Sequence, residues 1–539
     1  MKRFNVTGLC VPLKHYMVDI SGKVDQIMEL INYGHYFTIN RGRQYGKTTT
    51  LHQLEKRLAD DYICASISFE GVGDESFEAP EAFCQMLLRK ISRALAFSSA
   101  SEEYAAGWLN NDAVSFESLG EHITKMCSVA KADQGKNVVL IIDEVDKTSS
   151  NRVFLHFLGL LRDKFLSARA GKDYTFQSVI LAGVTDIKNL KLKMINDGLY
   201  TRTDSVGKLY NSPWNIAVSF NVDMSFDPAE IATMLSDYER DHNTCMDISQ
   251  VSKEIHEYTS GYPVLVSRVC QCIDEELEKD WTKKGIQDAV KTITQEKSVL
   301  FTDMFKNLEN DKELYDFIYA ILIVGEQKTY VLDNPIVEFA DMYGYIKKSN
   351  GNSGAKSSGS AIIANKIFEM RMSYYFSSKD ENVSRIDNVF SRSLYREIVQ
   401  NGVFNMELCL RKFAQHYMEL YSKADEPFLE RHGRLLFLSY LRPLVNGQGF
   451  YHIESQFTGL RRMDVVVDFG RDQFIIELKL WRGETARERA YDQLLEYMGS
   501  KGADKGYLLT FDFRKEGNRE HKAEWMQVGS GKMIFEVVV

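Results

Sequence analysis

The stretch from Asn40 to Thr50, Asn-Arg-Gly-Arg-Gln-Tyr-Gly-Lys-Thr-Thr-Thr, constrains the fold more than any other part of the chain. It follows an apolar, β-prone run at residues 36–39 and precedes a helical pattern with leucines three and four residues apart. A phosphate-binding loop of the form G-x-x-x-x-G-K-[ST] requires this strand-to-helix context. The match is incomplete at its start, because Arg41 stands where the first glycine belongs and the nearest glycine is Gly42. The alternative interpretation is a basic turn before an ordinary helix.

Each residue type in such a loop has a defined task. Gly46 would let the backbone curl around a phosphate, so that successive N–H groups and the positive end of the following helix face the anion. Lys47 would reach the β- and γ-phosphate oxygens, and Thr48 would bind Mg²⁺. The other residues that we expect around the nucleotide are Arg41, Gly42, Arg43, Gln44, Tyr45 and Thr49.

A second signal is the run Val-Val-Leu-Ile-Ile-Asp-Glu at residues 138–144. A continuous apolar run is typical of a parallel strand buried on both faces, and ligands of open α/β sheets bind at the carboxyl ends of such strands. Asp143 would hold Mg²⁺ and Glu144 would orient the water that attacks the γ-phosphate. The alternative is a pair of acids that merely follow a strand.

Length and composition narrow the class of protein. A chain of 539 residues is expected to form about three or four domains. The net charge of −9 provides no global attraction to nucleic acid, so such binding would need local basic patches. The eight scattered cysteines form no CxxC pair, and no apolar run is long enough for a signal peptide or membrane span. We therefore expect a cytoplasmic protein without membrane contact.

Together these motifs resemble the AAA-ATPase-like group of P-loop proteins, close to the archaeal-type ATPases and STAND switches. The resemblance covers residues 1 to about 375 and includes the segments Asn-Ser-Pro-Trp-Asn-Ile-Ala at 211–217 and Gly-Tyr-Pro at 261–263. It implies a P-loop ATPase core with a parallel sheet at residues 1–220 and a helical lid at 221–300. ATP would be the bound nucleotide.

The middle of the chain changes character. Short β-prone runs at 344–348 and 361–365 flank a Ser-, Gly- and Asn-rich tip, which predicts the wing of a winged-helix-like domain at residues 301–376. The alternative is a hairpin without a partner. We favour a relay role over DNA binding, because Lys347, Lys348 and Lys356 make only a sparse basic patch. Residues 377–399 are polar and are interpreted as a linker.

Three residues near the C-terminus form a second constellation. Glu477 and Lys479 are two positions apart and therefore lie on one face of an otherwise apolar strand. Asp464, from the preceding strand, would join Glu477 and the Leu478 carbonyl in binding Mg²⁺, with Mn²⁺ as an alternative. Lys479 would position or activate the water that attacks a phosphodiester. The alternative is a fortuitous salt-bridged strand pair.

This pattern resembles the PD-(D/E)XK nuclease superfamily over residues 400–539, which implies an α/β nuclease-like domain. A following helix that carries Gln493 adds to the match. Related domains fused to such ATPases carry a Gly-x-Gly-Arg-x-Asp run before this strand. Here the run Gly-Leu-Arg-Arg-Met-Asp at 459–464 has Arg461 in place of the second glycine. Nearby arginines would clamp phosphates or form a solvated basic face; they are Arg461, Arg462, Arg482, Arg487 and Arg489.

The sequence supports two hypotheses for the whole chain. In the first, an ATPase relays its nucleotide state through the winged-helix lid to a Mg²⁺-dependent nuclease that acts on nucleic acid, most reasonably DNA. In the second, a STAND-type ATP-dependent switch carries a catalytically inactive nuclease-like domain that binds nucleic acid or a protein partner. Neither hypothesis decides whether the protein forms a homo-oligomer, because no arginine finger is identifiable in the sequence.

Overall fold

The computed structural model describes residues 2–539 except 99, 109–112, 149–151, 185–213, 325, 350–358, 380–391, 421–425, 446–448, 455–463, 482, 513, 515–521 and 529–530. For a few further residues, Asp464 among them, only the backbone is described. The chain forms two compact units. The N-terminal unit contains residues 1–256 and 261–271, and the C-terminal unit contains residues 257–260 and 272–539.

Four parallel strands form the centre of the N-terminal unit, in the order β1-β4-β3-β2. They are β1 (Phe37–Asn40), β2 (Tyr62–Ser68), β3 (Asn137–Asp143) and β4 (Ser178–Gly183). Strands β3 and β4 are buried along nearly their whole length, which explains why their sequences are continuously apolar. The expected α/β fold with a parallel sheet is confirmed. Because the strands are parallel, the loop after β1 and the acids after β3 meet at one edge.

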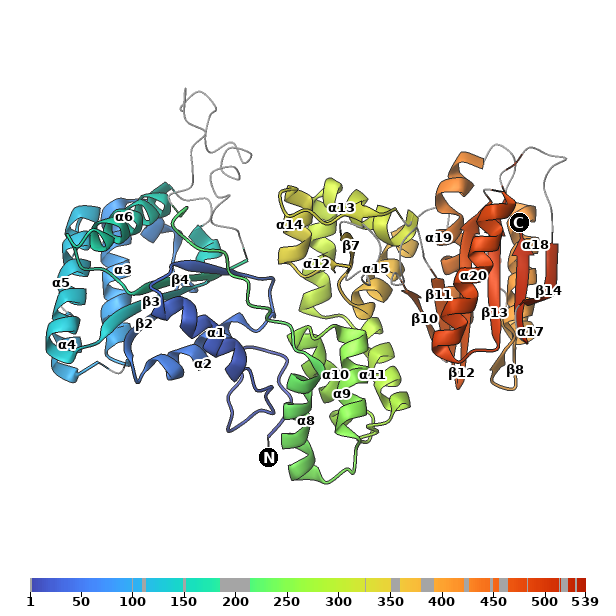
Figure 1. The fold of residues 1–539 in the computed structure, drawn as a ribbon, viewed down its shortest axis with the longest axis horizontal. Helices are drawn as coiled ribbons and strands as arrows, with labels where there is room; N and C mark the ends of the chain where they lie inside the picture. Colours follow the sequence, from blue (N-terminus) through green and yellow to red (C-terminus); the bar gives the residue numbers. More distant parts are fainter. Residues whose placement is uncertain are drawn as a thin grey trace. The chain divides into compact units, whose positions relative to one another are not determined.

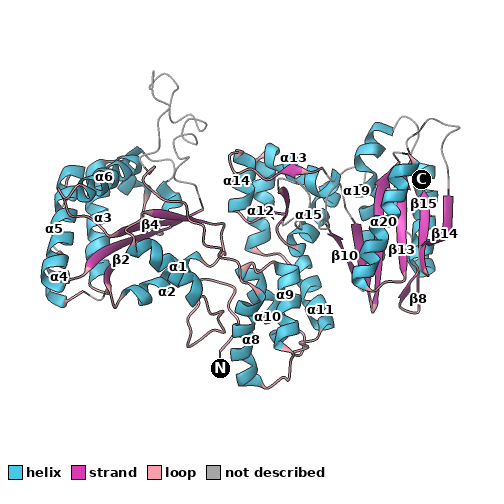
Figure 2. Ribbon diagram, viewed as in Figure 1, coloured by secondary structure: helices cyan, strands magenta, loops and turns pink. Residues whose placement is uncertain are grey.

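Helices cover both faces of this sheet (Figures 1 and 2). On one side lie α1 (Ser21–Asn32) and α2 (Lys47–Leu58), and on the other lie α3 (Pro80–Leu95), α5 (Phe116–Gln134) and α6 (Arg152–Arg169). A short helix, α4 (Glu102–Ala106), and the 3₁₀ segments Asp74–Phe77 and Val145–Thr148 complete this part. A large hydrophobic cluster fills the space between α3, α5, α6 and the sheet.

Three further helices follow: α8 (Pro228–His242), α9 (Ile248–Thr259) and α10 (Pro263–Glu275). Helix α8 begins with a capping box, in which Asp227 and Glu230 accept each other's backbone N–H groups. The turn before α10 requires glycine, because Gly261 has φ +72° and a Cβ there would lie 1.9 Å from the Phe226 carbonyl oxygen. Helices α9 and α10 each contribute residues to both units.

The first half of the C-terminal unit is mainly helical. Its elements are α11 (Lys283–Gln295), α12 (Val299–Asn310), α13 (Lys312–Tyr319), a π-helical turn (Ala320–Val324), α14 (Pro335–Met342) and α15 (Lys366–Lys379). A small antiparallel sheet has the order β5-β7-β6 and consists of Lys328–Thr329, Ser360–Ile363 and Ile346–Lys348. Most of the polar tip between β6 and β7 lies outside the described residues.

The second half of this unit is built on a six-stranded mixed sheet with the order β10-β11-β12-β13-β15-β14. The strands are β10 (Gly449–Glu454), β11 (Asp464–Phe469), β12 (Asp472–Leu480), β13 (Lys505–Phe511), β14 (Lys522–Val528) and β15 (Lys532–Val538). The helices are α17 (Arg392–Ile398), α18 (Met406–Leu420), α19 (Glu426–Val445) and α20 (Glu484–Lys501), with a small hairpin of β8 (Val399–Gln400) and β9 (Val403–Phe404).

Helix α20 packs on one face of this sheet. Its residues Ala490 and Leu494 join Ile475, Leu508 and Ile534 of the strands in one hydrophobic cluster. Helix α18 covers the opposite face, where Phe413 and Tyr417 contact the ring of Phe511. No helix in the described part of the chain is long and apolar enough to cross a membrane.

Candidate functional site

The loop between β1 and α2 curves back on itself. Gly46, which precedes the first residue of α2, has φ +79°, and Gln44 has φ +60°. The left-handed positions of the loop are therefore 44 and 46, whereas Arg41 keeps a negative φ. This explains how arginine is accommodated where the motif has a glycine.

Lys47 lies inside this curve. It is only 7% exposed, and its ammonium group donates to the carbonyl oxygens of Arg41 at 2.8 Å and Gly42 at 3.0 Å. Burial lowers the pKa of Lys47, against the opposing charges of Glu144, Asp146 and Asp143. A buried cation next to a helix N-terminus is suited to bind an anion such as a phosphate.

The acids that follow β3 adjoin the loop. Thr48 Oγ1 donates to Asp143 Oδ2 at 3.0 Å, and the other oxygen of Asp143 accepts the Glu144 backbone N–H at 2.9 Å. Glu144 adopts a left-handed conformation with φ +56°, which is unusual for a residue with a side chain. Burial, and then the charge of Asp143, raise the pKa of Glu144. The structure thus brings together Lys47, Thr48, Asp143 and Glu144.

Two aromatic residues join this loop to the start of α10. The Tyr262 hydroxyl donates to the Arg43 carbonyl oxygen at 3.0 Å, and its ring meets the ring of Tyr45 edge-on with centroids 4.6 Å apart. The Tyr45 hydroxyl is 2.8 Å from the Ser225 hydroxyl oxygen. The loop backbone is therefore held directly by the segment that precedes α10.

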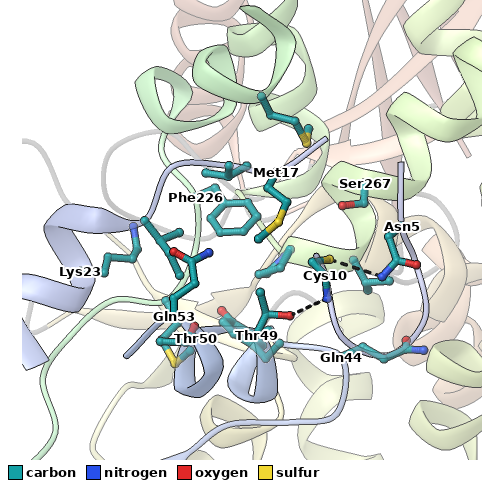
Figure 3. Close-up of a pocket in the computed structure, with 18 of the residues that line it drawn as sticks. Asn5, Cys10, Met17, Lys23, Gln44, Thr49, Thr50, Gln53, Phe226 and Ser267 are labelled. Atoms are coloured by element: carbon teal, nitrogen blue, oxygen red, sulfur yellow. Dashed lines mark hydrogen bonds between the residues drawn. The ribbon is translucent and has the colours of Figure 1, made fainter. Parts of the chain in front are cut away.

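A pocket opens beside the loop (Figure 3). Its empty volume is about 880 Å³, a figure that includes space open to solvent. Gly46, Thr49, Thr50 and Gln53 line it from one face of α2. The apolar side chains that line the rest include Met17, Val18, Met224, Phe226 and Val264.

Residues 5–10 form one wall of this pocket, and the sequence did not mark them as part of a site. The Cys10 N–H donates to Thr49 Oγ1 at 3.2 Å, and Asn5 Nδ2 donates to Cys10 Sγ at 3.4 Å (Figure 3). Residues 5–10 have no helical or strand periodicity, so no local signal marks them. Tyr16 also lines the pocket, but its hydroxyl is used in contacts with Asp241 and His242 of α8.

A second cluster lies on the α20 face of the six-stranded sheet. Glu477 and Lys479 of β12 form an ion pair, and Lys479 Nζ donates to Gln493 Oε1 of α20 at 3.2 Å. In the antiparallel register, position 464 of β11 lies directly opposite Glu477. The structure thus brings together Glu477, Lys479 and Gln493. The Asp464 side chain lies outside the described atoms, so its part in a metal site stays a prediction.

Glu477 is an unusual buried carboxylate. It is 0% exposed, and no described group forms a hydrogen bond to either of its carboxylate oxygens. Arg434 of α19 is partly buried, and burial lowers its pKa to about 10 although the charge of Glu477 opposes this shift. Leu478 is buried in the same strand and is paired with Leu509 of β13. Apart from the ion pair with Lys479, no described hydrogen bond compensates this buried carboxylate, and such burial is costly unless a further ligand binds.

Arg487, one of the arginines expected to contact phosphates, is bound to an acid of the sheet. Arg487 of α20 donates through Nη2 to Glu536 at 2.6 Å and through Nε at 2.9 Å, and Glu536 also accepts from the Tyr491 hydroxyl at 2.8 Å. Glu536 is 0% exposed, so Arg487 is not part of a solvated basic face. The run at 459–463 and Arg482 lie outside the described residues. Among the described residues, no three His, Cys, Asp or Glu side chains gather as metal ligands.

The chain is similar to one protein family and to several solved structures. The family model described as an AAA-like domain matches residues 14–356. Among solved structures, the Walker-type ATPase paby2304 of Pyrococcus abyssi is 12% identical, with 68% of this chain and 99% of that chain covered and a TM-score of 0.44. The Aeropyrum pernix ORC2 protein in its ADPNP-ADP complexes is 11% identical, with 64% and 88% covered and a TM-score of 0.32. No curated protein matches the chain.

Proposed function

Because the chain belongs to the AAA-like domain family, we propose that its N-terminal unit binds and hydrolyses ATP at the loop formed by residues 41–49. The observation that carries the proposal is the meeting of Lys47, Thr48 and Asp143 at the carboxyl edge of a parallel sheet. Lys47 would exchange its bonds to the loop carbonyls for bonds to phosphate oxygens. The N–H groups at the start of α2 would surround the same phosphates.

The groups around the loop fit a metal-assisted phosphoryl transfer. Thr48 and Asp143 would hold Mg²⁺, which when bound neutralises charge on the phosphate oxygens. Glu144 would orient a water molecule and take its proton as the water oxygen bonds to the γ-phosphorus and the bond to the ADP oxygen breaks. The raised pKa of Glu144 favours this proton transfer near neutral pH.

The base would occupy the pocket beside the loop. Thr49, Thr50 and Gln53 line it along α2, beginning next to the phosphate loop. Met17 and Phe226 supply apolar surface for a flat ring, and Figure 3 shows both side chains in the pocket. The N-terminal segment, which forms one wall of the pocket, would thereby contact the base.

Phosphate release from ATP tests the proposal. Glu144→Gln keeps the size of the side chain but removes its carboxylate, so we expect kcat to fall by about 10²- to 10⁴-fold with little change in ATP affinity. Glu81→Gln, on the exposed start of α3, is the matched control and should behave as the wild type. Equal turnover in the two variants would refute the assignment of Glu144.

A second activity, Mg²⁺-dependent hydrolysis of phosphodiesters, is supported by the buried carboxylate of Glu477. Its two oxygens without described hydrogen-bond partners suit a cation, and the register puts position 464 opposite. Asp464, Glu477 and the Leu478 carbonyl would hold the metal, which lowers the pKa of bound water. Lys479, held by Gln493, would position that water against the phosphorus.

The competing proposal is a nucleotide-dependent switch whose nuclease-like domain binds nucleic acid or a protein without cutting. Digestion of plasmid and single-stranded DNA with Mg²⁺ or Mn²⁺, with and without ATP, separates the two. Cutting that Glu477→Ala abolishes, while ATP turnover persists, supports the nuclease. ATP binding without digestion of any substrate supports the switch.

The link between these activities would run through the winged-helix-like region. The antiparallel sheet β5-β7-β6 beside helices α12–α15 supports that domain type. Lys347 donates to Ser260 at 2.9 Å, and burial lowers its pKa, which favours an internal role over contact with DNA. We therefore propose that this domain relays the nucleotide state between the two activities. The proposed domains remain an ATPase core, a helical lid, a winged helix, a linker and a nuclease-like domain.

A further inference from the structure

Trp481 directly continues the strand that carries Glu477 and Lys479. Its backbone N–H donates to the Phe511 carbonyl oxygen at 2.9 Å, which extends the β12–β13 pairing by one residue. Because side chains alternate along a strand, Glu477, Lys479 and Trp481 lie on the same face. The Trp481 side chain is partly exposed at the carboxyl end of this strand.

Two arginines lie against the Trp481 ring. The guanidinium carbon of Arg514 is 4.2 Å from the ring centroid, and that of Arg487 is 5.9 Å away. Each guanidinium is held by a buried acid. Asp512 accepts from Arg514 Nε at 3.0 Å and Nη2 at 2.7 Å, and Glu536 holds Arg487 in the same way.

The ion pair between Asp512 and Arg514 differs from an ordinary surface ion pair in how far each side chain is exposed to solvent. The Asp512 side chain is 1% exposed, whereas the Arg514 side chain paired with it is 34% exposed. The buried carboxylate of Asp512 therefore fixes the orientation of the Arg514 guanidinium plane, which reaches solvent. Because both arginines are neutralised by acids, they are poorly suited to compete for phosphates, but their hydrogen bonds to the acids orient the guanidinium planes beside the indole.

We propose that Trp481 and Arg514 form a stacking platform for unpaired nucleobases. Bases stack on aromatic rings and on arginine planes irrespective of their sequence. The platform is fixed in advance by Asp512, so little side-chain freedom is lost when a base stacks on it. A duplex keeps its base faces covered by its own stacking, so the preferred ligand is a single strand or an unpaired end.

The position of the platform suits the proposed phosphodiester hydrolysis, on which its biological use rests. With a rise of about 3.3 Å per residue, Trp481 lies roughly 7 Å beyond Lys479 along the strand. Stacked nucleotides advance about 3.4 Å each, so a base on Trp481 would belong to a nucleotide within a few positions of the attacked phosphate. The platform would then fix the register of a single strand relative to Glu477 and Lys479.

Fluorescence anisotropy with the full-length protein in EDTA tests the platform without cleavage. The probes are fluorescein-labelled dT12, rU12 and a 12-base-pair DNA duplex. Trp481→Leu keeps apolar volume but removes the π face, and we expect about 5- to 100-fold weaker binding of the single strands. Binding of the duplex should change less than about twofold.

Two further variants keep the test interpretable. Trp481→Phe retains a ring and should bind dT12 more tightly than Trp481→Leu. Trp525→Phe alters a tryptophan that contacts Phe535 and Tyr507 on the opposite face of the same sheet, and it should bind as the wild type does. Thermal melting of each variant identifies any loss of folding.

The outcomes separate the platform from the nuclease. No binding of either single strand by the wild type, unchanged binding in Trp481→Leu, or equal loss on single strands and duplex would overturn the platform. Selective loss on single strands supports it, even where the wild type with Mg²⁺ digests no substrate and the nuclease proposal fails.

Discussion

Glu477→Leu is expected to stabilise the C-terminal unit while it abolishes the proposed phosphodiester hydrolysis. Glu477 is 0% exposed, and within the described part of the chain its carboxylate oxygens form an ion pair with Lys479 but accept no other hydrogen bond. Its charged partner, Lys479, is 22% exposed and also donates to Gln493. Lys479 therefore keeps hydration and one hydrogen bond when the acid is removed.

The size of the expected stabilisation follows from the difference in exposure between Glu477 and Lys479. Replacing a whole buried ion pair by apolar residues of similar volume is often stabilising by about 1–4 kcal/mol, and removing one partner alone is destabilising only when the charge left behind is buried. Because Lys479 stays in place and loses its ion pair, we expect the lower half of that range, about 1–2 kcal/mol. For a unit of this size the midpoint of unfolding should rise by about 2–8 °C.

Differential scanning calorimetry of the full chain measures this change. Glu488→Leu, at an exposed position of α20, is the control and should shift the midpoint by less than the buried substitution. A Glu477→Leu protein that melts several degrees below the wild type would refute the reasoning. It would show that the carboxylate stabilises the fold and is not kept at a cost for function.

The remaining predictions concern the N-terminal unit. Gly261→Ala should lower its melting midpoint by more than Gly171→Ala, because both positions have positive φ but only at 261 would the Cβ meet the Phe226 carbonyl; equal shifts in calorimetry would contradict this. ATP turnover should fall with decreasing pH through a value above the usual glutamate range, because burial and Asp143 raise the pKa of Glu144, whose carboxylate is needed as the base. A pH profile of kcat that stays flat down to the ordinary glutamate pKa would contradict the second expectation.

The parts of the nucleotide site that the sequence predicted are those with short-range signals. The loop at 41–48 and the strand before Asp143 are marked by residue order alone, and the parallel sheet brings them together because all its strands end at one edge. The pocket wall at residues 5–10 has no such signal. It is positioned by tertiary contacts such as the bond between Cys10 and Thr49.

In the C-terminal unit, too, the sequence marks individual residues but not the tertiary contacts that they make. Glu536 is a lone acid in the apolar strand β15, a signal of the same kind as Glu477 in β12. Its partner was not predictable, because the pairing with Arg487 depends on where α20 packs across the sheet. Sequence proximity grouped Arg487 with the other arginines around the proposed metal site, whereas in the structure Arg487 is bound to Glu536.

The most direct test of the central claim is calorimetric titration of the full chain with Mg²⁺ and ATP. Lys47→Ala removes the buried ammonium group inside the loop, and Lys56→Ala removes an exposed lysine from the same helix as a control. We predict a single nucleotide site in the wild type and in Lys56→Ala, and about 10- to 100-fold weaker binding in Lys47→Ala. Equal affinity in the two variants would contradict the claim that this loop binds the triphosphate.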